Sequence, residues 1–587
     1  MKRFMTGIAL LFAVAAFSLS GQGVAMPFYA VDVDVECASA EKAAKAELKF
    51  LPLPEGKEVA FSCRWDDSSL THQRTLDLMK KHNFKGTFYL TGGGRAEFWK
   101  KVFPNLCKDG FTVGNHTLSH KHLPFLTLET IHYEILWWNI LLECRADRPI
   151  TILVMPFGSI STPHFPGISQ LIGKSVQRTG LIGGADISPQ LYARYGLPQN
   201  EFFTPRLISP GDREPDCKKF DAQITRHLSS SDKPLYLTLG VHSWHTDKGL
   251  IDLGKSLAKY GNNPKWWYCT APEFSAYRFM ALNSRVKSKK VEGSRVRFTV
   301  ELPDPAFLGS TTPLWGECGG KTFAIPHTRQ LPGKIALADK NGKNEKFPAI
   351  VTTLESTSSG ALTLKVKNSG APLENVLFSF RLPPAYDFVT KEGAKMGVYQ
   401  ISVDRIGESF TCMTPAVLPN GKVPRGAGNE IMAAQMDFNC GKLRGRIWNV
   451  LTVKKAAPAA ENYKLSISAK AFSAAEAKEL SLASKSVDGS FRNVAHMENW
   501  RSGAYQLKLD PKKELGKKIA VMMCFKGKGK MTLRGELPQV VYCNGKELKV
   551  VNSSVALGEL QGECRVVFVY PPQTRSQKNI VLLLKED

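Results

Sequence analysis

The sequence predicts an α/β domain followed by all-β, sandwich-like domains. Its length of 587 residues exceeds one domain and suggests three. Up to about residue 285, short apolar runs alternate with amphipathic helical stretches, which indicates parallel strands with helices packed outside them. Beyond that point, apolar and polar residues alternate with a period of two between turns rich in Gly, Pro and Asn. That pattern is typical of β-sandwich strands.

The spacing of apolar residues also predicts the individual helices and strands. Helical spacing of apolar residues predicts helices over 71–82, 126–144, 218–228 and 273–282. Continuous apolar runs predict buried strands over 59–63, 150–154 and 235–241. Two-residue alternation predicts strands over 294–302, 361–367, 374–382 and 397–403, then over 518–525, 540–543 and 565–570.

Changes in pattern place the domain borders. A stretch rich in Ala, Lys and Ser separates two β regions, and it suits a linker and a helical spacer equally well. We predict a signal peptide over 1–25, the α/β domain over 45–285, a β-sandwich over 290–453, the linker or spacer over 454–489 and a C-terminal β domain over 490–587.

The first residues have the pattern of a secretory signal peptide. The charged start MKR at 1–3 is followed by an apolar run over 8–17 and a small-residue cleavage site at 23–25. We therefore expect a bacterial protein that is secreted or periplasmic. The apolar run is too short to span a membrane, and no later stretch reaches about 18 apolar residues, so no membrane-spanning segment is expected.

Twelve widely spaced cysteines are compatible with an oxidising compartment but form no dense disulfide framework. The chain has no Cys-x-x-Cys pair, which argues against a structural zinc knuckle. The sequence leaves the connectivity of any disulfides open. We expect Cys63, in a predicted strand, to face the core.

Two carboxylates and two histidines have the spacing of a catalytic metal site. Asp66 and Asp67 follow the strand over 59–63, and His116 and His120 lie some fifty residues later. Three such ligands with an open position, plus one carboxylate as a base, suit zinc chemistry. Taken alone, an Asp pair is usually a turn or a helix cap. His122 leaves an all-histidine site open as well.

The surrounding motifs resemble the polysaccharide deacetylase family, carbohydrate esterase family 4, over about residues 55–283. The most specific similarity is GNHTLSH at 114–120, which resembles the family's second motif. The family's other motifs resemble WDD at 65–67, KGTFYL at 85–90, MPFG at 155–158 and LTLGVH at 237–242. The resemblance implies a distorted β/α barrel, whose sites form at the carboxyl ends of strands.

The resemblance also implies a role for each site residue. Asp67, His116 and His120 would hold one divalent metal ion. Zinc is the expected ion, although cobalt, nickel and manganese tolerate the same ligands. Asp66 would be the general base that takes a proton from metal-bound water. His242 would be the general acid that protonates the leaving group.

The chain departs from the family in two supporting positions. Val154 stands where the third motif normally carries an arginine that pairs with the base. Without a cation, burial and the neighbouring carboxylate would raise the pKa of Asp66. Arg64 and Arg206 are the candidates to supply that charge. Asp186 is the candidate to orient the acid histidine.

Further residues are assigned by their neighbourhood in the sequence. His245 competes with His242 for the acid role, and His72 lies near the Asp pair, but we expect both at the surface. Trp244 neighbours the acid, and Pro156 lies in the third motif, so we predict that both bind substrate. Core packing is the alternative role for a tryptophan.

These features predict an exported, metal-dependent hydrolase that removes acetyl groups from polysaccharide sugars, either N-acetylhexosamine or O-acetyl glycan. A catalytically lapsed glycan-binding protein and a cell-surface structural protein are the alternatives. The net charge is +25, and most of the positive excess is located after residue 285. This excess suits binding to an anionic or peptidoglycan-like glycan, and general solubility explains it as well. No nucleic-acid partner is expected, because the chain carries no recognisable binding motif.

Overall fold

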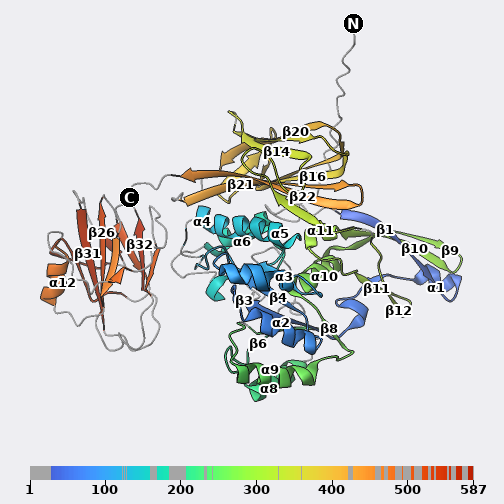
Figure 1. The fold of residues 1–587 in the computed structure, drawn as a ribbon, viewed down its shortest axis with the longest axis horizontal. Coiled ribbons are helices and arrows are strands. Elements are labelled where there is room, and N and C mark those ends of the chain that lie inside the picture. Colours follow the sequence, from blue (N-terminus) through green and yellow to red (C-terminus); the bar gives the residue numbers. More distant parts are fainter. Residues whose placement is uncertain are drawn as a thin grey trace, which may run out of the picture.

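The computed structural model shows a parallel α/β domain, a β-sandwich and a C-terminal β module (Figure 1). The residues that it describes are 28–121, 123, 126, 128–158, 168–183, 206–229, 234–240, 242–327, 329–358, 360–420, 428–455, 464–468, 474–482, 492–493, 504–507, 519–526, 530–534, 537–551, 554–556, 563–571 and 580–585. The predicted signal peptide, His122 and Asp186 lie outside these ranges.

The α/β domain is built on a parallel, barrel-like sheet. The strands run side by side in the order β5 (Thr112–Asn115), β4 (Gly86–Leu90), β3 (Val59–Asp66), β7 (Leu235–Leu239) and β6 (Arg206–Ile208), and β8 (Trp266–Tyr268) also pairs with β3. Every residue of β3 is buried, as a central strand with neighbours on both sides requires. The predicted strand over 150–154 makes only isolated bridges, from Leu153 to Asn115 and from Ile152 to Gly183.

Helices cover this sheet close to their predicted positions. They include α2 (His72–Lys81), α8 (Cys217–Leu228) and α10 (Ala271–Asn283). A further helix, α9 (Asp247–Tyr260), was not predicted. The helix predicted over 126–144 is interrupted. It consists of α4 (Leu128–His132), a π-helical turn over Tyr133–Trp137 and α5 (Trp138–Ala146). Apolar periodicity does not reveal a π-turn, because the turn shifts the helix face by a single residue.

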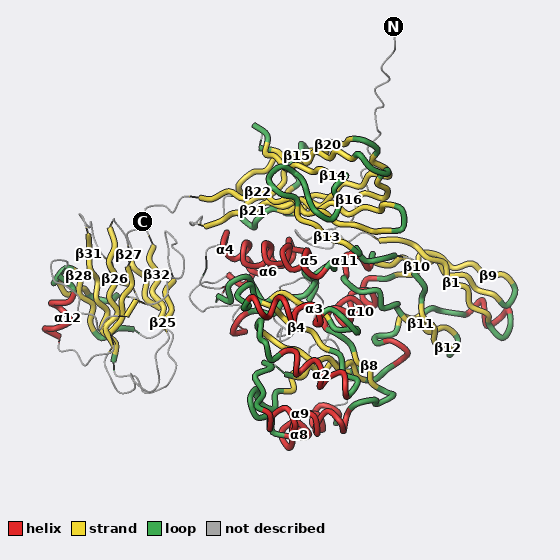
Figure 2. Tube along the Cα trace, viewed as in Figure 1, coloured by secondary structure: helices red, strands yellow, loops and turns green. Residues whose placement is uncertain are grey.

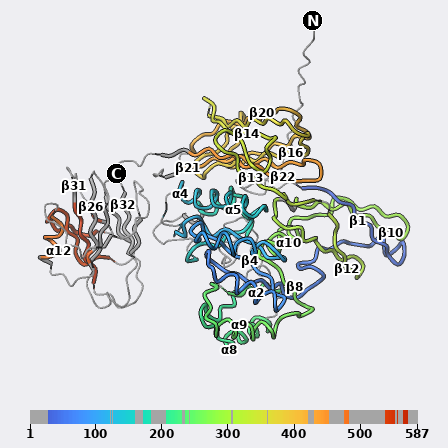
Figure 3. The backbone as a smooth tube through the Cα atoms, viewed as in Figure 1, coloured from blue at the N-terminus to red at the C-terminus, as the bar shows by residue number. Residues whose placement is uncertain are grey.

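An additional strand precedes the predicted start of the α/β domain at residue 45. Strand β1 (Phe28–Glu36) pairs antiparallel with β10 (Arg295–Pro303), which in turn pairs with β9 (Arg285–Glu292). Figure 3 shows this β1 segment beside strands from the middle of the chain. The apolar positions of β1 and β10 alternate and pack on the inner face of the sheet.

The β-sandwich consists of two five-stranded sheets. One has the order β13 (Lys334–Leu337), β22 (Leu443–Lys455), β21 (Gly428–Cys440), β16 (Leu373–Arg381) and β19 (Val398–Ile406). The other has the order β14 (Ile350–Ser356), β15 (Ala361–Asn368), β20 (Ser409–Pro419), β17 (Tyr386–Val389) and β18 (Lys395–Met396). Alternating residues of both sheets, such as Leu364 and Phe378, form the shared core.

One sheet of the sandwich packs on the helices of the α/β domain. Figure 1 shows β21 and β22 lying along α4 and α5. Glu143 of α5 accepts hydrogen bonds from Arg446 at 3.0 Å and from the Trp448 indole at 2.8 Å. All three side chains are buried. A buried ion pair that is fully hydrogen-bonded fixes the geometry of this contact.

In the parts that the structure describes, the C-terminal module consists of strands and one short helix (Figure 2). Its larger sheet includes β23 (Lys464–Ser468), β26 (Ile519–Lys526), β31 (Glu563–Tyr570) and β28 (Val540–Cys543). The expectation of a linker or helical spacer over 454–489 is therefore wrong for β23. Leu465 and Ile467 alternate with polar residues there, and among the residues of this segment that the structure describes, those of α12 (Ala474–Leu480) are helical.

Among the described helices, none has the length and apolar character needed to cross a membrane. Cys63 lies in the core of the α/β domain, as its strand position predicted.

Candidate metal centre and active site

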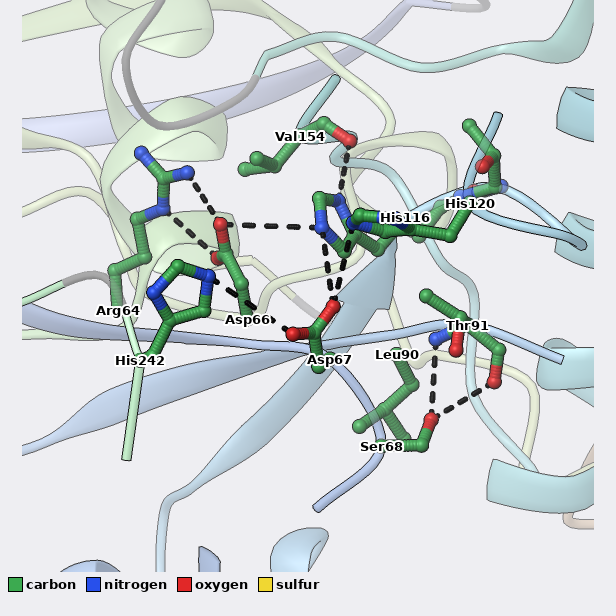
Figure 4. A network of polar contacts seen from close by, with 12 residues as sticks. Arg64, Asp66, Asp67, Ser68, Leu90, Thr91, His116, His120, Val154 and His242 are labelled. Atoms are coloured by element: carbon green, nitrogen blue, oxygen red, sulfur yellow. Dashed lines mark hydrogen bonds and ion pairs between the residues drawn. The ribbon is translucent and has the colours of Figure 1, made fainter. Parts of the chain in front are cut away.

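The carboxyl ends of three strands of the parallel sheet meet at one site. Asp66 is the last residue of β3, His116 directly follows β5, and His242 lies just beyond β7. Asp66 and His242 form an isolated parallel bridge. Figure 4 shows the side chains of these residues converging with those of Asp67 and His120. The sheet therefore gathers residues that are up to 176 positions apart in the chain.

Asp67, His116 and His120 form a cluster that fits a divalent metal ion. Their ligand atoms all lie within 4.8 Å of one another. Asp67 Oδ1 is 3.3 Å from His120 Nε2 and 3.7 Å from His116 Nε2. Ligand atoms about 2.0–2.2 Å from a tetrahedral zinc ion lie at comparable separations from each other. Two imidazoles and one carboxylate are also a ligand set found in catalytic zinc sites.

The backbone of Val154 orients the first histidine ligand. His116 Nδ1 lies 2.8 Å from the Val154 carbonyl oxygen. A carbonyl only accepts hydrogen bonds, so Nδ1 carries the proton and the lone pair on Nε2 faces Asp67. Such a contact fixes both the tautomer and the ring plane of a metal ligand. Residue 154 thus supports the site through its main chain.

The loop that carries both histidines is held by Asn115 and Glu134. Asn115 Oδ1 accepts from the Thr117 N–H at 2.8 Å, a local turn that accompanies a positive φ of 64° at Thr117. Glu134, in the π-helical turn, accepts from the Ser119 N–H at 2.7 Å and from its hydroxyl. The irregular helix therefore lies where a metal-site loop is anchored.

Arg64 supplies the positive charge beside the base. Its Nε donates to Asp66 Oδ1 at 2.9 Å and its Nη2 donates to Oδ2, and both side chains are buried. Burial acts to raise the pKa of Asp66, but the charge and hydrogen bonds of Arg64 outweigh it and hold that pKa below its ordinary value. The raised pKa was expected only without a cation, and Arg64, one of the two candidates, supplies that cation.

Arg206, the other candidate for that charge, lies lower in the sheet. It pairs with Leu237 of β7, which is level with Phe61 of β3, five residues before Asp66. Arg64 and Asp66 instead lie two residues apart on one strand, so their side chains share a face. Strand periodicity was the signal that distinguishes the two arginines.

Asp212 orients the predicted acid, a role that sequence reasoning gave to Asp186. Asp212 Oδ2 lies 2.9 Å from His242 Nδ1, and Oδ1 accepts from the His242 backbone N–H at 3.3 Å. Burial acts to lower the pKa of His242, but the hydrogen bond and charge of Asp212 raise it above its ordinary value. Asp212 lies just beyond β6, the neighbour of β7, and that strand-end position was the available signal.

Two histidines that were expected at the surface are buried. His72 is 0% exposed and His245 is 6% exposed. His72 Nε2 donates to the Asp67 carbonyl oxygen at 2.7 Å, and its Nδ1 lies 2.7 Å from Ser243 Oγ. His72 thereby connects the loop of Asp67, whose φ is 73°, to the loop that follows β7. His245 packs edge-on against Trp65.

Aromatic side chains flank the metal-ligand cluster. Trp244 is 42% exposed, and its ring stacks on the imidazole of His242 with centroids 3.9 Å apart. Pro156, the other predicted substrate contact, is buried. The next residue, Phe157, is 57% exposed and packs edge-on against His120. Phe157, rather than Pro156, therefore faces the approach to the site.

Comparisons with known proteins address the same part of the chain. Residues 55–171 match the polysaccharide deacetylase family model. A peptidoglycan-N-acetylglucosamine deacetylase of Bacillus cereus is 30% identical over 87 residues, which make up 15% of this chain and 31% of that relative. The match therefore spans about a third of the relative's length.

Several solved structures are similar to somewhat more than a third of this chain. The catalytic domain of a peptidoglycan N-acetylglucosamine deacetylase from Eubacterium rectale is 17% identical, with a TM-score of 0.29, and covers 38% of this chain and 91% of its own. A family 4 acetyl xylan esterase from Clostridium thermocellum, in complex with a cobalt ion, is 14% identical, with a TM-score of 0.27, and covers 37% and 89%. The family match confirms the prediction from the motifs: this chain carries a divergent domain of the polysaccharide deacetylase family.

Proposed function

We propose that the chain is a metal-dependent carbohydrate deacetylase that hydrolyses the acetyl amide or ester of a polymer sugar. One observation carries this proposal: the cluster of Asp67, His116 and His120 has a carboxylate and a histidine close beside it, on two strand ends that pair with each other. Asp66 Oδ2 lies 3.9 Å from His116 Nε2, and His242 Nε2 lies 3.9 Å from Asp67 Oδ2. The proposed base and the proposed acid therefore each lie within 4 Å of one of the metal ligands.

Asp67, His116 and His120 would hold a divalent cation, which would supply Lewis acidity that lowers the pKa of water and polarises an acetyl carbonyl. Asp66, kept ionised by Arg64, accepts the proton of the attacking water at a carboxylate oxygen. His242, kept protonated by Asp212, gives its Nε2 proton to the leaving amine or alcohol as the bond to the acetyl carbon breaks. Acetate and the free sugar group are the products. Zinc is the ion that we propose.

Export and substrate class are further parts of this proposal. The pattern of residues 1–25 supports a secreted or periplasmic location. The name of the Bacillus cereus relative supports a peptidoglycan-like substrate that contains N-acetylglucosamine. The ester-cleaving family 4 neighbour is why O-acetyl glycans belong in the same test. We propose no nucleic-acid partner.

The lapsed glycan-binding alternative depended on Val154. Arg64 donates two hydrogen bonds to Asp66 and so supplies a cation beside it from another position. This pairing supports the active enzyme over the lapsed glycan-binding protein and over the purely structural one.

Acetate release by the purified protein tests the proposal. The substrates are acetylated chitin, peptidoglycan and xylan oligomers, each assayed with and without a chelator. We expect chelator-sensitive release that falls by about 10²–10⁴-fold in Asp66→Asn, the range for loss of a general base. Asp77→Asn, an exposed acid of α2, is the matched control. No release from any oligomer by a protein with stoichiometric zinc would overturn the proposal.

A further inference from the structure

We propose that the cavity beside the metal-ligand cluster is a subsite for a carboxylate-bearing sugar, and that Arg95 binds the carboxylate. The inference rests on the proposed function and specifies its substrate. It makes Arg95 a specificity residue that selects an acidic polymer, in which the acetylated sugar has a carboxylate-bearing neighbour.

The cavity opens directly from the metal-ligand cluster. It has a volume of about 420 Å³ and is lined by Asp67, Ser68, Gly93, Arg95 and Trp244, among others. This volume lies within the usual range for small-ligand pockets, about 300–1,000 Å³. One wall thus carries a metal ligand, a second an exposed indole and a third a guanidinium group. Of these groups, the guanidinium carries the positive charge that a carboxylate can pair with.

The glycine loop after β4 explains how Arg95 reaches this cavity. A Cβ on Gly92 would lie 2.7 Å from the Leu118 carbonyl oxygen, and a Cβ on Gly94 would lie 2.8 Å from the Ser68 Cβ. Only glycine permits such close packing, so the loop lies tightly against both metal-site loops. Trp99 Nε1 donates to the Gly94 carbonyl oxygen at 3.0 Å and fixes the far side of the loop. Arg95 therefore projects from a well-packed loop.

The charge of Arg95 is available to a ligand. No ion pair to its guanidinium is found among the residues that the structure describes. The nearby acid Glu97 is paired instead with Lys101, at 2.8 Å. Asp67 also lines the cavity, but the proposed metal ion engages that carboxylate. A guanidinium offers two parallel N–H groups that match the two oxygens of a carboxylate, which makes a planar carboxylate its natural partner.

Trp244 completes the subsite on the other side of Asp67. Its exposed face offers an apolar platform for a sugar ring, and its other contact is the stacked ring of His242. An acetylated sugar over this platform places its acetyl group toward the metal ligands. The next sugar of the polymer then occupies the part of the cavity that Arg95 lines.

The test compares two acetylated oligomers that differ only in charge. One is a peptidoglycan-type tetrasaccharide with free lactyl carboxylates, and the other is the same oligomer with each carboxylate converted to a methylamide. We expect the wild type to prefer the free acid in kcat/KM by about 10- to 100-fold, as hydrogen bonds between charged groups are worth about 1.5–3 kcal/mol. In Arg95→Gln this ratio falls toward one, mainly through KM, and Arg95→Lys keeps part of it.

Lys100→Gln is the matched control, because Lys100 is an exposed cation on the following helical turn and does not line the cavity. It should retain the wild-type ratio, and the melting temperature of each variant checks the fold. Equal wild-type use of both oligomers, or an unchanged ratio in Arg95→Gln, would overturn the subsite and leave the deacetylase proposal intact.

Turnover of neither oligomer would count against the deacetylase function instead. In that case calorimetric binding of the two oligomers to the Asp66→Asn protein decides the subsite by itself. Tighter binding of the free acid that Arg95→Gln abolishes supports it, and equal binding refutes it.

Discussion

Arg64 and Asp66 lie two residues apart on the same face of β3, and the guanidinium donates two hydrogen bonds to the carboxylate. The proposed general base and its cationic partner therefore come from one strand. The arginine that the family places in another motif is replaced here by Val154, whose main chain orients His116. The same pairing of charges is achieved from a different segment of the barrel-like domain.

The acidic side of the activity profile should depend on Arg64. The charge of Arg64 lowers the pKa of Asp66, so Arg64→Gln should raise that pKa. A higher pH is then needed to ionise the Asp66 carboxyl. We expect the acidic limb of kcat/KM to move to higher pH by about one to three units. Arg206→Gln, lower in the sheet, should leave the limb in place. A profile of Arg64→Gln that coincides with the wild type would contradict this role.

The alkaline side should depend on Asp212. This carboxylate raises the pKa of His242, so Asp212→Asn lowers it and the acid loses its proton at lower pH. The alkaline limb of kcat/KM should therefore move to lower pH. Activity at pH 8 should decrease, by no more than the contribution of a general acid, about 10²–10⁴-fold. Glu214→Gln, an exposed acid two residues further on, is the control. A shift to higher pH would show that another group protonates the leaving atom.

His72 should support metal binding without contacting the ion. His72→Phe keeps an aromatic ring of similar size but removes the bonds to the Asp67 carbonyl and to Ser243. Loss of an outer contact of this kind typically weakens metal affinity by about 10- to 100-fold. Competition with a zinc-binding dye measures the affinity, and the melting temperature without metal separates this effect from misfolding. Unchanged zinc affinity would contradict the assignment.

Folding stability should decrease on acidification because of His132. Burial, with Arg178 and Arg381 nearby, lowers the pKa of this histidine from 6.5 to about 3. The unfolded chain therefore binds the proton first, so stability is full above pH 6.5 and falls by about 1.4 kcal/mol for each pH unit below it, down to about pH 3.

The melting temperature between pH 7 and pH 4 measures this effect. It should fall less steeply in His132→Asn than in the wild type, although other buried histidines, such as His245 with a pKa of about 4, remain in both proteins. Parallel curves for the two proteins would exclude His132 as a source of acid sensitivity.

Local pattern predicted much of the fold. Apolar runs located β3 and β7, helical spacing located α2 and α8, and two-residue alternation located β10, β15 and β16. These elements are predictable because each buries a face that is set by its own residues. Strand β23 was missed because its short alternation lies within a stretch rich in Ala, Lys and Ser. The π-turn over Tyr133–Trp137 was missed because it changes the period of a helix that is apolar on both sides of the turn.

The sequence by itself determined which residue types are available to the site and that they lie at strand ends: Asp66 and Asp67 after one apolar run, His116 and His120 after another, and His242 after a third. The tertiary structure alone decided the partners of these groups. Asp212, His72 and the Val154 carbonyl come from other segments, and sheet order and loop path bring them within hydrogen-bonding distance. Such partners depend on long-range geometry, which leaves no periodic pattern in the sequence. The end of a strand does leave one, because the apolar run stops there.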